Sequence, residues 1–455
     1  MSNAMTLVKK RWPLGVSVLV ILVVLPAAWF VSGGMNQQIR ESQRSEGERL
    51  LQQLKGLTVS YSLPAPFEGL EEIRESGVLP HEKRTSFFRE QLELQDARIE
   101  EAVATIADFN QKGRGPLVEG LFPKEPADGT QAQLLRLQMQ KLLVPDDDPG
   151  TQAAYEALVA SLNATTPPEP QMVLERLRDE EQRLLEREQA KSGRSELTAE
   201  EADALQDELK EQRLNLYARR AQDHSIYMSL DVFSGELPTS AGLSFPRQAL
   251  ARPPLHATTW FWQYDYWLAE DVVGFLRLAN TRNGELLPIV EAPIKRVVSL
   301  SAPPFDVTRT TMQDGVEVAG DVGPSPRTGV FEPRYVVSPS GRDPGWSNQL
   351  YDIRPVRMSL VVDSRRIPEI LDATAQQNLI TVTDLDVGPV DAWEHVEQGY
   401  FYGPAHVVQL DLQLEFIYLR SWTAPLMPDV IRTNLGMEPH PEEEPEDSGD
   451  GDGPR

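Results

Sequence analysis

The chain has 455 residues, 40% of them hydrophobic and 7% aromatic, so it is long enough for two or three folded units and is not disordered throughout. Its 44 Lys and Arg against 69 Asp and Glu give a formal net charge of −25, which repels a phosphate backbone and excludes nucleic acid as a partner. The absence of cysteine excludes disulfides, thiol catalysis, cysteine-ligated zinc and a cysteine-linked lipid.

An uncharged stretch between Arg11 and Arg40 predicts a transmembrane helix over residues 13–32. Its 18 most apolar residues, Leu14 to Val31, would form roughly 27 Å of helix, close to the thickness of the hydrocarbon core. Three basic residues directly precede the span, which favours a cytoplasmic N-terminus for residues 1–12. We therefore expect a single-pass membrane protein whose bulk lies in an extracytoplasmic compartment.

The main alternative for this stretch is a signal peptide that is cleaved after Ala28. A cut there would place Pro26 at the −3 position, and the apolar run continues as far as Val31. The uncleaved anchor is therefore the favoured interpretation.

Residues 33–223 are polar and helical in character, which predicts a stalk. Apolar residues recur at every third or fourth position, the spacing of a coiled-coil seam. Either this seam pairs with another chain, or the helices form a hairpin within one chain, with a turn at Ser192-Gly193. The leucines at the clearest seam positions are candidate interface residues: Leu174, Leu177, Leu184, Leu205, Leu209 and Leu216.

Prolines interrupt this stalk between residues 60 and 150, which predicts short helices and loops there rather than one rod. Residues 87–109 form one such predicted helix. An acidic triplet at 146–148 is interpreted as solvated, so no metal site is expected.

Residues 224–432 show a different pattern, in which strands and helices alternate. The expected strands are 226–233, 294–302, 356–362, 379–387 and 407–419, and the expected helices are 258–281 and 364–378. A Pro- and Gly-rich insert, 303–353, with a minor strand near 335–337, separates two strands. Two helix–strand–strand units predict an α+β fold, a four-stranded sheet with two helices on one face, of the ferredoxin-like kind. Residues 433–455 read as a disordered acidic tail.

No local motif points to catalysis. The sequence lacks a phosphate-binding Gly-rich loop, a His-Glu-x-x-His motif and a Gly-x-Ser-x-Gly elbow, and its six histidines have no ligand-like spacing. His395 is interpreted as part of a surface loop, and Asp384 and Asp386 as solvated charges at a sheet edge. We therefore expect no enzyme activity, no catalytic residues, no metal, no cofactor and no small-molecule substrate.

An aromatic cluster on the helix 258–281 covers most of its circumference, so one side packs on the sheet and another needs a second cover. That cover is either the chain's own stalk or insert, or a partner subunit. Trp260, Trp262 and Trp267 are accordingly candidate interface residues.

The order of anchor, helical stalk and two helix–strand–strand units resembles the PilO and PilN inner-membrane alignment proteins of type IV pilus and type II secretion systems. The resemblance extends to the PilO-like membrane-associated proteins of Planctomycetes and Verrucomicrobia, over about residues 10–60 and 170–425. It is carried by Trp262-Gln263, Tyr266-Trp267 and Glu270-Asp271-Val272, by Ala292 to Arg296, and by Val356 to Asp363 leading into Ile367 to Leu371.

This resemblance implies a structural component of a cell-envelope assembly, acting as a homodimer or as a heterodimer with a similar PilN- or PilO-like subunit. The alternative is an anchored extracytoplasmic ligand-binding or sensory module, whose pocket would be lined by the insert and the aromatic helix. A cryptic hydrolase has the least support.

Overall fold

The computed structural model describes residues 3–56, 58–63, 72–144, 152–193, 197–234, 243, 246, 252–302, 310–313, 316–319, 340 and 350–441. The chain divides into two compact units, Met1–Thr105 and Ile106–Arg455. The predicted strand at 335–337, most of the insert 303–353 and the acidic residues beyond 441 lie outside the described part.

Unit 1 begins with a long helix, α1 (Asn3–Gly56), which continues well past the predicted end of the anchor. Its stretch Val16–Gln53 is long and apolar enough to cross a membrane, with a mean hydropathy of 2.4 in its most apolar window and no buried residue there. A signal sequence near an N-terminus meets the same criteria of length and composition.

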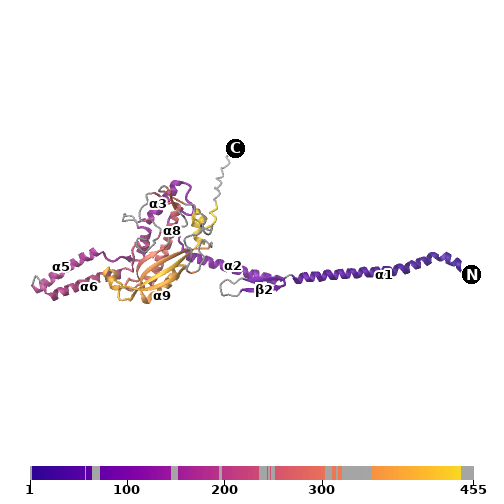
Figure 1. Ribbon diagram of the computed structural model, residues 1–455, viewed down its shortest axis with the longest axis horizontal. Coiled ribbons are helices and arrows are strands. Elements are labelled where there is room, and N and C mark those ends of the chain that lie inside the picture. The colour runs from indigo at the N-terminus through magenta and orange to yellow at the C-terminus, as the bar shows by residue number, and fades with distance from the viewer. Residues whose placement is uncertain are drawn as a thin grey trace, which may run out of the picture. The chain divides into compact units, whose positions relative to one another are not determined.

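A β-hairpin and most of a second long helix, whose last turn belongs to unit 2, complete unit 1 (Figure 1). Strands β1 (Val59–Leu63) and β2 (Ile73–Val78) pair antiparallel, and the 30-residue helix α2 (Glu82–Gln111) follows. The ring of Tyr61 stacks on that of Phe88 with centroids 5.0 Å apart, which ties the hairpin to α2. Helix α2 contains the helix predicted over residues 87–109 and extends beyond it at both ends.

Unit 2 is a mixed α and β structure. Its larger helices are α3 (Gly129–Leu143), α4 (Ala154–Ser161), α5 (Pro170–Ser192), α6 (Ala199–Asp223), α8 (His256–Ala279) and α9 (Ile367–Gln377). The short ones are α7 (Asp231–Ser234), η1 (Ser364–Arg366), α10 (Ala392–Glu397), α11 (Arg420–Thr423), η2 (Ala424–Leu426) and α12 (Asp429–Asn434).

The main sheet has six strands in the order β11-β12-β10-β7-β4-β3. These are β11 (Ile380–Pro389), β12 (Val407–Leu419), β10 (Tyr351–Asp363), β7 (Ile294–Ser301), β4 (Ile226–Tyr227) and β3 (Ala164–Thr165). The first four run antiparallel to their neighbours, whereas β4 and β3 add parallel pairs beside β7. Two separate hairpins, β5 (Thr281–Arg282) with β6 (Glu285–Leu286) and β8 (Thr310–Gln313) with β9 (Val316–Ala319), complete the strands.

The sheet corrects three sequence-based expectations. It has six strands rather than four, and β3 comes from residues assigned to the stalk. The strand predicted over 226–233 ends at Tyr227, because the chain turns and forms α7 instead. Strand β10 begins at Tyr351, inside the predicted insert, and pairs with β12 along its whole length.

Helices α8 and α9 pack against each other over one face of this sheet (Figure 1). Their apolar side chains join those of the strands in one large core. Residues 118–162 also contribute to it. Leu121, Phe122 and Met139 lie in the predicted Pro-rich interruption 60–150, and Tyr155 lies in the predicted stalk beyond it. A smaller core around Tyr227, Val361 and Tyr402 completes the unit.

Helices α5 and α6 form a hairpin that projects from unit 2 (Figure 1). Gly193 ends α5 in the left-handed conformation, with a φ of 64°, a conformation that glycine adopts without steric cost. Thr198 and Glu201 form a capping box that starts α6. Arg187 of α5 forms an ion pair with Glu208 of α6 at 3.2 Å.

Strand β11 forms one edge of the main sheet among the described strands. Two of its backbone N–H groups are occupied by side chains of the same strand. Asp384 accepts a hydrogen bond from Leu385 N at 2.9 Å, and Asp386 accepts one from Val387 N at 2.9 Å. These carboxylates are therefore edge groups, as expected from the sequence.

Candidate functional site

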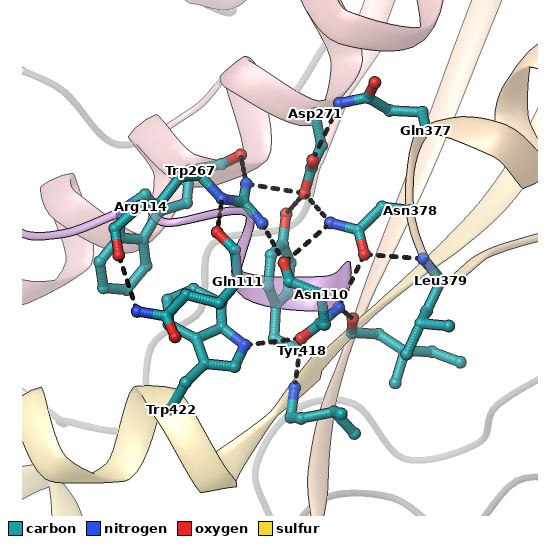
Figure 2. Close-up of polar contacts among 12 residues, drawn as sticks. Asn110, Gln111, Arg114, Trp267, Asp271, Gln377, Asn378, Leu379, Tyr418 and Trp422 are labelled. Atoms are coloured by element: carbon teal, nitrogen blue, oxygen red, sulfur yellow. Dashed lines mark hydrogen bonds and ion pairs between the residues drawn. The ribbon is translucent and has the colours of Figure 1, made fainter. Parts of the chain in front are cut away.

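A buried polar network lies where helix α2 ends in unit 2 (Figure 2). At its centre is Asp271 of α8, which is 1% exposed. Its carboxylate accepts hydrogen bonds from Gln377 Nε2 at 3.2 Å, Asn378 Nδ2 at 2.9 Å and the Tyr418 hydroxyl at 2.9 Å. A buried carboxylate is costly unless it is paired and hydrogen-bonded, and this one has both kinds of compensation.

The charge partner of Asp271 is Arg114, whose Nη1 lies 2.9 Å from Asp271 Oδ2. The chain reaches this position through a left-handed turn at Lys112 and Gly113, directly after α2. The turn brings the guanidinium back onto the end of the helix, where it donates to the carbonyls of Asn110 at 2.6 Å and Gln111 at 3.0 Å. These are carbonyls of the last helical turn, which have no partner within a helix.

Asn110, in the last turn of α2, is fully buried and uses both ends of its amide. Its Nδ2 donates to Asn378 Oδ1 at 2.8 Å and to the Ile417 carbonyl at 2.7 Å. Its Oδ1 accepts from Leu419 N at 2.8 Å and from Trp422 Nε1 at 2.7 Å. One side chain thereby joins α2 to β12, to α11 and to the residue between α9 and β11.

Burial also affects the protonation of the network. It raises the pKa of the Tyr418 hydroxyl well above its usual value, and the negative charge of Asp271 acts in the same direction. Tyr418 therefore stays protonated and remains a donor to Asp271. Glu270, the preceding residue on α8, has its pKa raised to about 7, chiefly by burial.

Unit 2 contains two further buried ion pairs. Arg354 of β10 pairs with Asp265 of α8 at 2.7 Å, and both are almost fully buried. Arg420 of α11 donates through Nε to Asp352 of β10 at 3.0 Å. In each pair the carboxylate faces an arginine, so neither charge is buried without a partner.

The residues that carry the family resemblance are mostly buried and hold the fold together. Gln263 accepts a hydrogen bond from Leu117 N at 2.6 Å, and Asp363 caps η1 through Arg365 N. Lys295 donates to the carbonyls of Ile289 at 2.7 Å and Val290 at 2.9 Å, and burial lowers its pKa to about 8.

The three candidate interface tryptophans lie inside unit 2. Trp260, Trp262 and Trp267 are at most 5% exposed. The second cover of α8 comes from the chain itself: Phe122 meets Trp260 edge-on at 5.4 Å, and Trp422 meets Trp267 at 4.8 Å between ring centroids. They therefore present no surface to a partner in this fold.

The candidate interface leucines lie on the α5–α6 hairpin. Leu184 is buried, Leu177, Leu205, Leu209 and Leu216 are half-buried, and Leu174 is exposed. The two helices pack against each other within one chain, which is the hairpin alternative that the sequence left open. Pairing of these leucines with a second chain stays a prediction.

Helix α2 has an exposed apolar face, and none of its residues was among the candidate interface residues. Leu92, Ile99, Val103 and Ile106 are spaced by seven, four and three residues and therefore share one helix face. They are 38–52% exposed. The spacing was visible in the sequence, but their exposure depends on which faces the rest of the chain covers.

No group of three or more His, Cys, Asp or Glu side chains suited to a metal occurs among the described residues. His395 lies beside Tyr402, with its Nδ1 2.9 Å from the tyrosine hydroxyl.

Comparisons with known proteins yield one structural likeness. Neither a family model nor a curated protein matches the chain. A solved structure, that of the type 4 fimbrial biogenesis protein PilO from Pseudomonas aeruginosa, is similar over 16% of this chain and 47% of that chain, with 14% identity and a TM-score of 0.12. This chain thus spans about half the length of that PilO structure, and the likeness is local.

Proposed function

We propose that this chain is a non-enzymatic, membrane-anchored structural component of a cell-envelope assembly related to pilus or secretion machinery. In this proposal α1 anchors the chain in the inner membrane, with unit 2 on the periplasmic side. Unit 2 is interpreted as a ferredoxin-like arrangement of two helix–strand–strand units, extended by β4 and β3. The helical segments serve as a stalk through which two subunits associate.

The observation that carries this proposal is the exposed apolar face of α2. Because Leu92, Ile99, Val103 and Ile106 are each 38–52% exposed, covering them would release water from apolar surface, the main driving force of association. Their spacing suits knobs-into-holes packing against a second helix. The proposed occupant is α2 of a second copy or of a similar subunit.

The buried network supports the same proposal from the other end of the helix. Asn110 and Arg114 hold the end of α2 to α8, to β12 and to the start of β11. The last turn of this helix, which belongs to unit 2, is thereby attached to the folded domain. In this proposal the attachment connects the paired helices to the domain that they serve.

The test is cross-linking of the full-length chain in membranes. The double substitution Ile99→Glu/Val103→Glu places two charges on the apolar face and should abolish the cross-linked dimer. The matched control, Glu90→Lys/Glu101→Lys, changes two charges on the opposite face of the same helix and should leave the dimer intact. An undiminished dimer in the first variant would refute association through α2.

A further inference from the structure

A cleft of about 230 Å³ opens at the base of the α5–α6 hairpin. It lies between the first turns of α5 and the last turns of α6, next to the residues that lead into and out of the hairpin. None of the contacts described above uses this cleft, so it is separate from the network at the end of α2.

The charge of the cleft is opposite to that of the whole chain. Its lining includes three arginines, Arg176, Arg219 and Arg220, and one carboxylate, Asp223. The chain as a whole carries 69 acidic against 44 basic residues. A local excess of arginine on so acidic a protein attracts anionic groups.

The arginines have few partners among the described residues. Arg220 is held in place by hydrogen bonds from its Nε to Thr165 Oγ1 at 2.9 Å and to the Thr166 carbonyl at 2.8 Å, and its two terminal nitrogens form no hydrogen bond with a residue that the structure describes. Arg176 and Arg219 are exposed and form no ion pair with any residue that the structure describes. An alternative role for Arg219 and Arg220 is to stabilise the C-terminal end of the α6 dipole. That role does not explain Arg176, which lies on α5.

The walls between the arginines are apolar. Met172 and Leu216 line the cleft, and Met172 is 49% exposed. A guanidinium binds a carboxylate with two parallel hydrogen bonds, and methionine packs against irregular aliphatic surface. Three arginines spread over two helices suit a peptide that carries several carboxylates, with proline residues to contact the apolar walls, better than they suit a single inorganic ion.

The chain itself contains such a peptide. Residues 442–455, EEEPEDSGDGDGPR, hold seven Asp and Glu against one Arg and lie outside the described part. They follow Pro441, whose carbonyl accepts a hydrogen bond from Lys124 Nζ at 3.3 Å. Fourteen extended residues reach at most about 50 Å.

We propose that the arginine-lined cleft at the base of the α5–α6 hairpin binds the acidic C-terminal segment, residues 442–455, of this chain. The segment comes either from the same molecule or from a second copy, and the chemistry of recognition is the same in both cases.

The absence of native cysteine makes site-directed disulfide cross-linking of the full-length chain in detergent a clean test. Met172→Cys is combined with Ser448→Cys, and the matched control combines Leu174→Cys with Ser448→Cys. Met172 and Leu174 lie on the same helix and are 49% and 53% exposed, but only Met172 lines the cleft. At low salt the Met172 pair should form a disulfide about tenfold faster than the control.

Charge substitutions then test whether the arginines cause the difference. Arg176→Glu/Arg219→Glu should remove the rate advantage, as should 0.5 M salt, because screening shortens the range of these interactions. Arg178→Glu/Arg183→Glu, on the same hairpin but outside the cleft, should preserve it. Equal rates for the Met172 and Leu174 pairs, or an advantage that survives the cleft substitutions, would overturn the proposal.

Competition identifies the ligand, and gel mobility identifies its source. A synthetic peptide of residues 442–455 should slow the cross-link at micromolar concentration. If millimolar inorganic phosphate or anionic lipid vesicles slow it while the peptide does not, the cleft binds phosphate groups and the proposal fails. A cross-linked monomer indicates the segment of the same molecule, and a cross-linked dimer that of a second copy.

Discussion

The guanidinium of Arg114 lies 2.9 Å from the carboxylate of Asp271, and both side chains are almost inaccessible to solvent. One residue follows the end of α2, and the other lies in the middle of α8. Their pairing joins two helices that are distant in sequence, and the two residues depend on each other because neither charge can be buried alone.

Arg114→Met should destabilise the protein by about 3–5 kcal/mol, because it leaves the Asp271 carboxylate buried without its charge partner. Urea unfolding of the full-length chain in detergent measures this loss. Arg183→Met removes an exposed ion pair to Glu180 and should cost less than about 1 kcal/mol. Similar losses for the two variants would mean that the buried pair contributes no more than a surface pair.

Asn110→Ala should cost about 2–4 kcal/mol, because it leaves Leu419 N–H, Trp422 Nε1–H and the Ile417 carbonyl without their partner. Hydrogen exchange at the Leu419 amide provides a local readout, and the amide should exchange at least tenfold faster. Asn215→Ala, on the exposed side of α6, is the control and should change stability by no more than about 0.5 kcal/mol. An unchanged Leu419 amide would show that the network does not hold this strand.

Gly274→Ala should be destabilising by about 1–3 kcal/mol, although alanine is the better helix former. A Cβ at this position of α8 would overlap Gln377 Nε2, and moving Gln377 breaks its hydrogen bond to Asp271. Gly47→Ala in α1 meets nothing within 4 Å and should be neutral or stabilising. Adding Gln377→Ala to Gly274→Ala should recover part of the lost stability. If it does not, the alanine at position 274 clashes with a residue other than Gln377.

Stability should fall as pH rises from about 5 to 8, because Glu270 has a folded pKa of about 7 against an ordinary value of 4.5. Burial raises that pKa, so the folded state holds the proton more tightly and ionisation at higher pH destabilises it. Its Oε2 has no hydrogen-bond partner among the described residues. The loss from this group is at most about 3 kcal/mol.

Glu270→Gln should remove this part of the pH dependence and raise the melting temperature at pH 8 while leaving it nearly unchanged at pH 5. Glu285→Gln, at an exposed turn, should show the pH profile of the parent chain. If Glu270→Gln keeps the parent's slope between pH 5 and 8, another group is responsible.

Much of the fold could be predicted where the local pattern and the tertiary structure agree. Strand β12 has the predicted bounds because alternation from Val407 to Leu419 continues without interruption. Helix α8 differs from its predicted bounds by two residues at each end. The range predicted for strand β4 is too long. Val232 N and Phe233 N donate hydrogen bonds to the carbonyls of Ser229 and Leu230 and form a turn, which the alternation of apolar and polar residues does not reveal.

The buried network could not be predicted from the sequence. Asn110 and Arg114 lie at and just beyond the end of a polar helix, and nothing nearby in the sequence distinguishes them from solvated residues. The other members of the network, Asn378, Tyr418 and Asp271, come from three separate parts of the chain. The same limit applies to the tryptophans of α8, because a pattern of aromatic residues does not show whether the chain or another subunit covers them.

The edge of the main sheet limits how this protein can join a larger structure. Since Asp384 and Asp386 already accept from the amides of Leu385 and Val387, an incoming strand finds those donors occupied and two carboxylates in its path. The far edge, β3, is only two residues long. Fibrous growth by edge-to-edge β-addition to the main sheet is therefore disfavoured at both of its described edges.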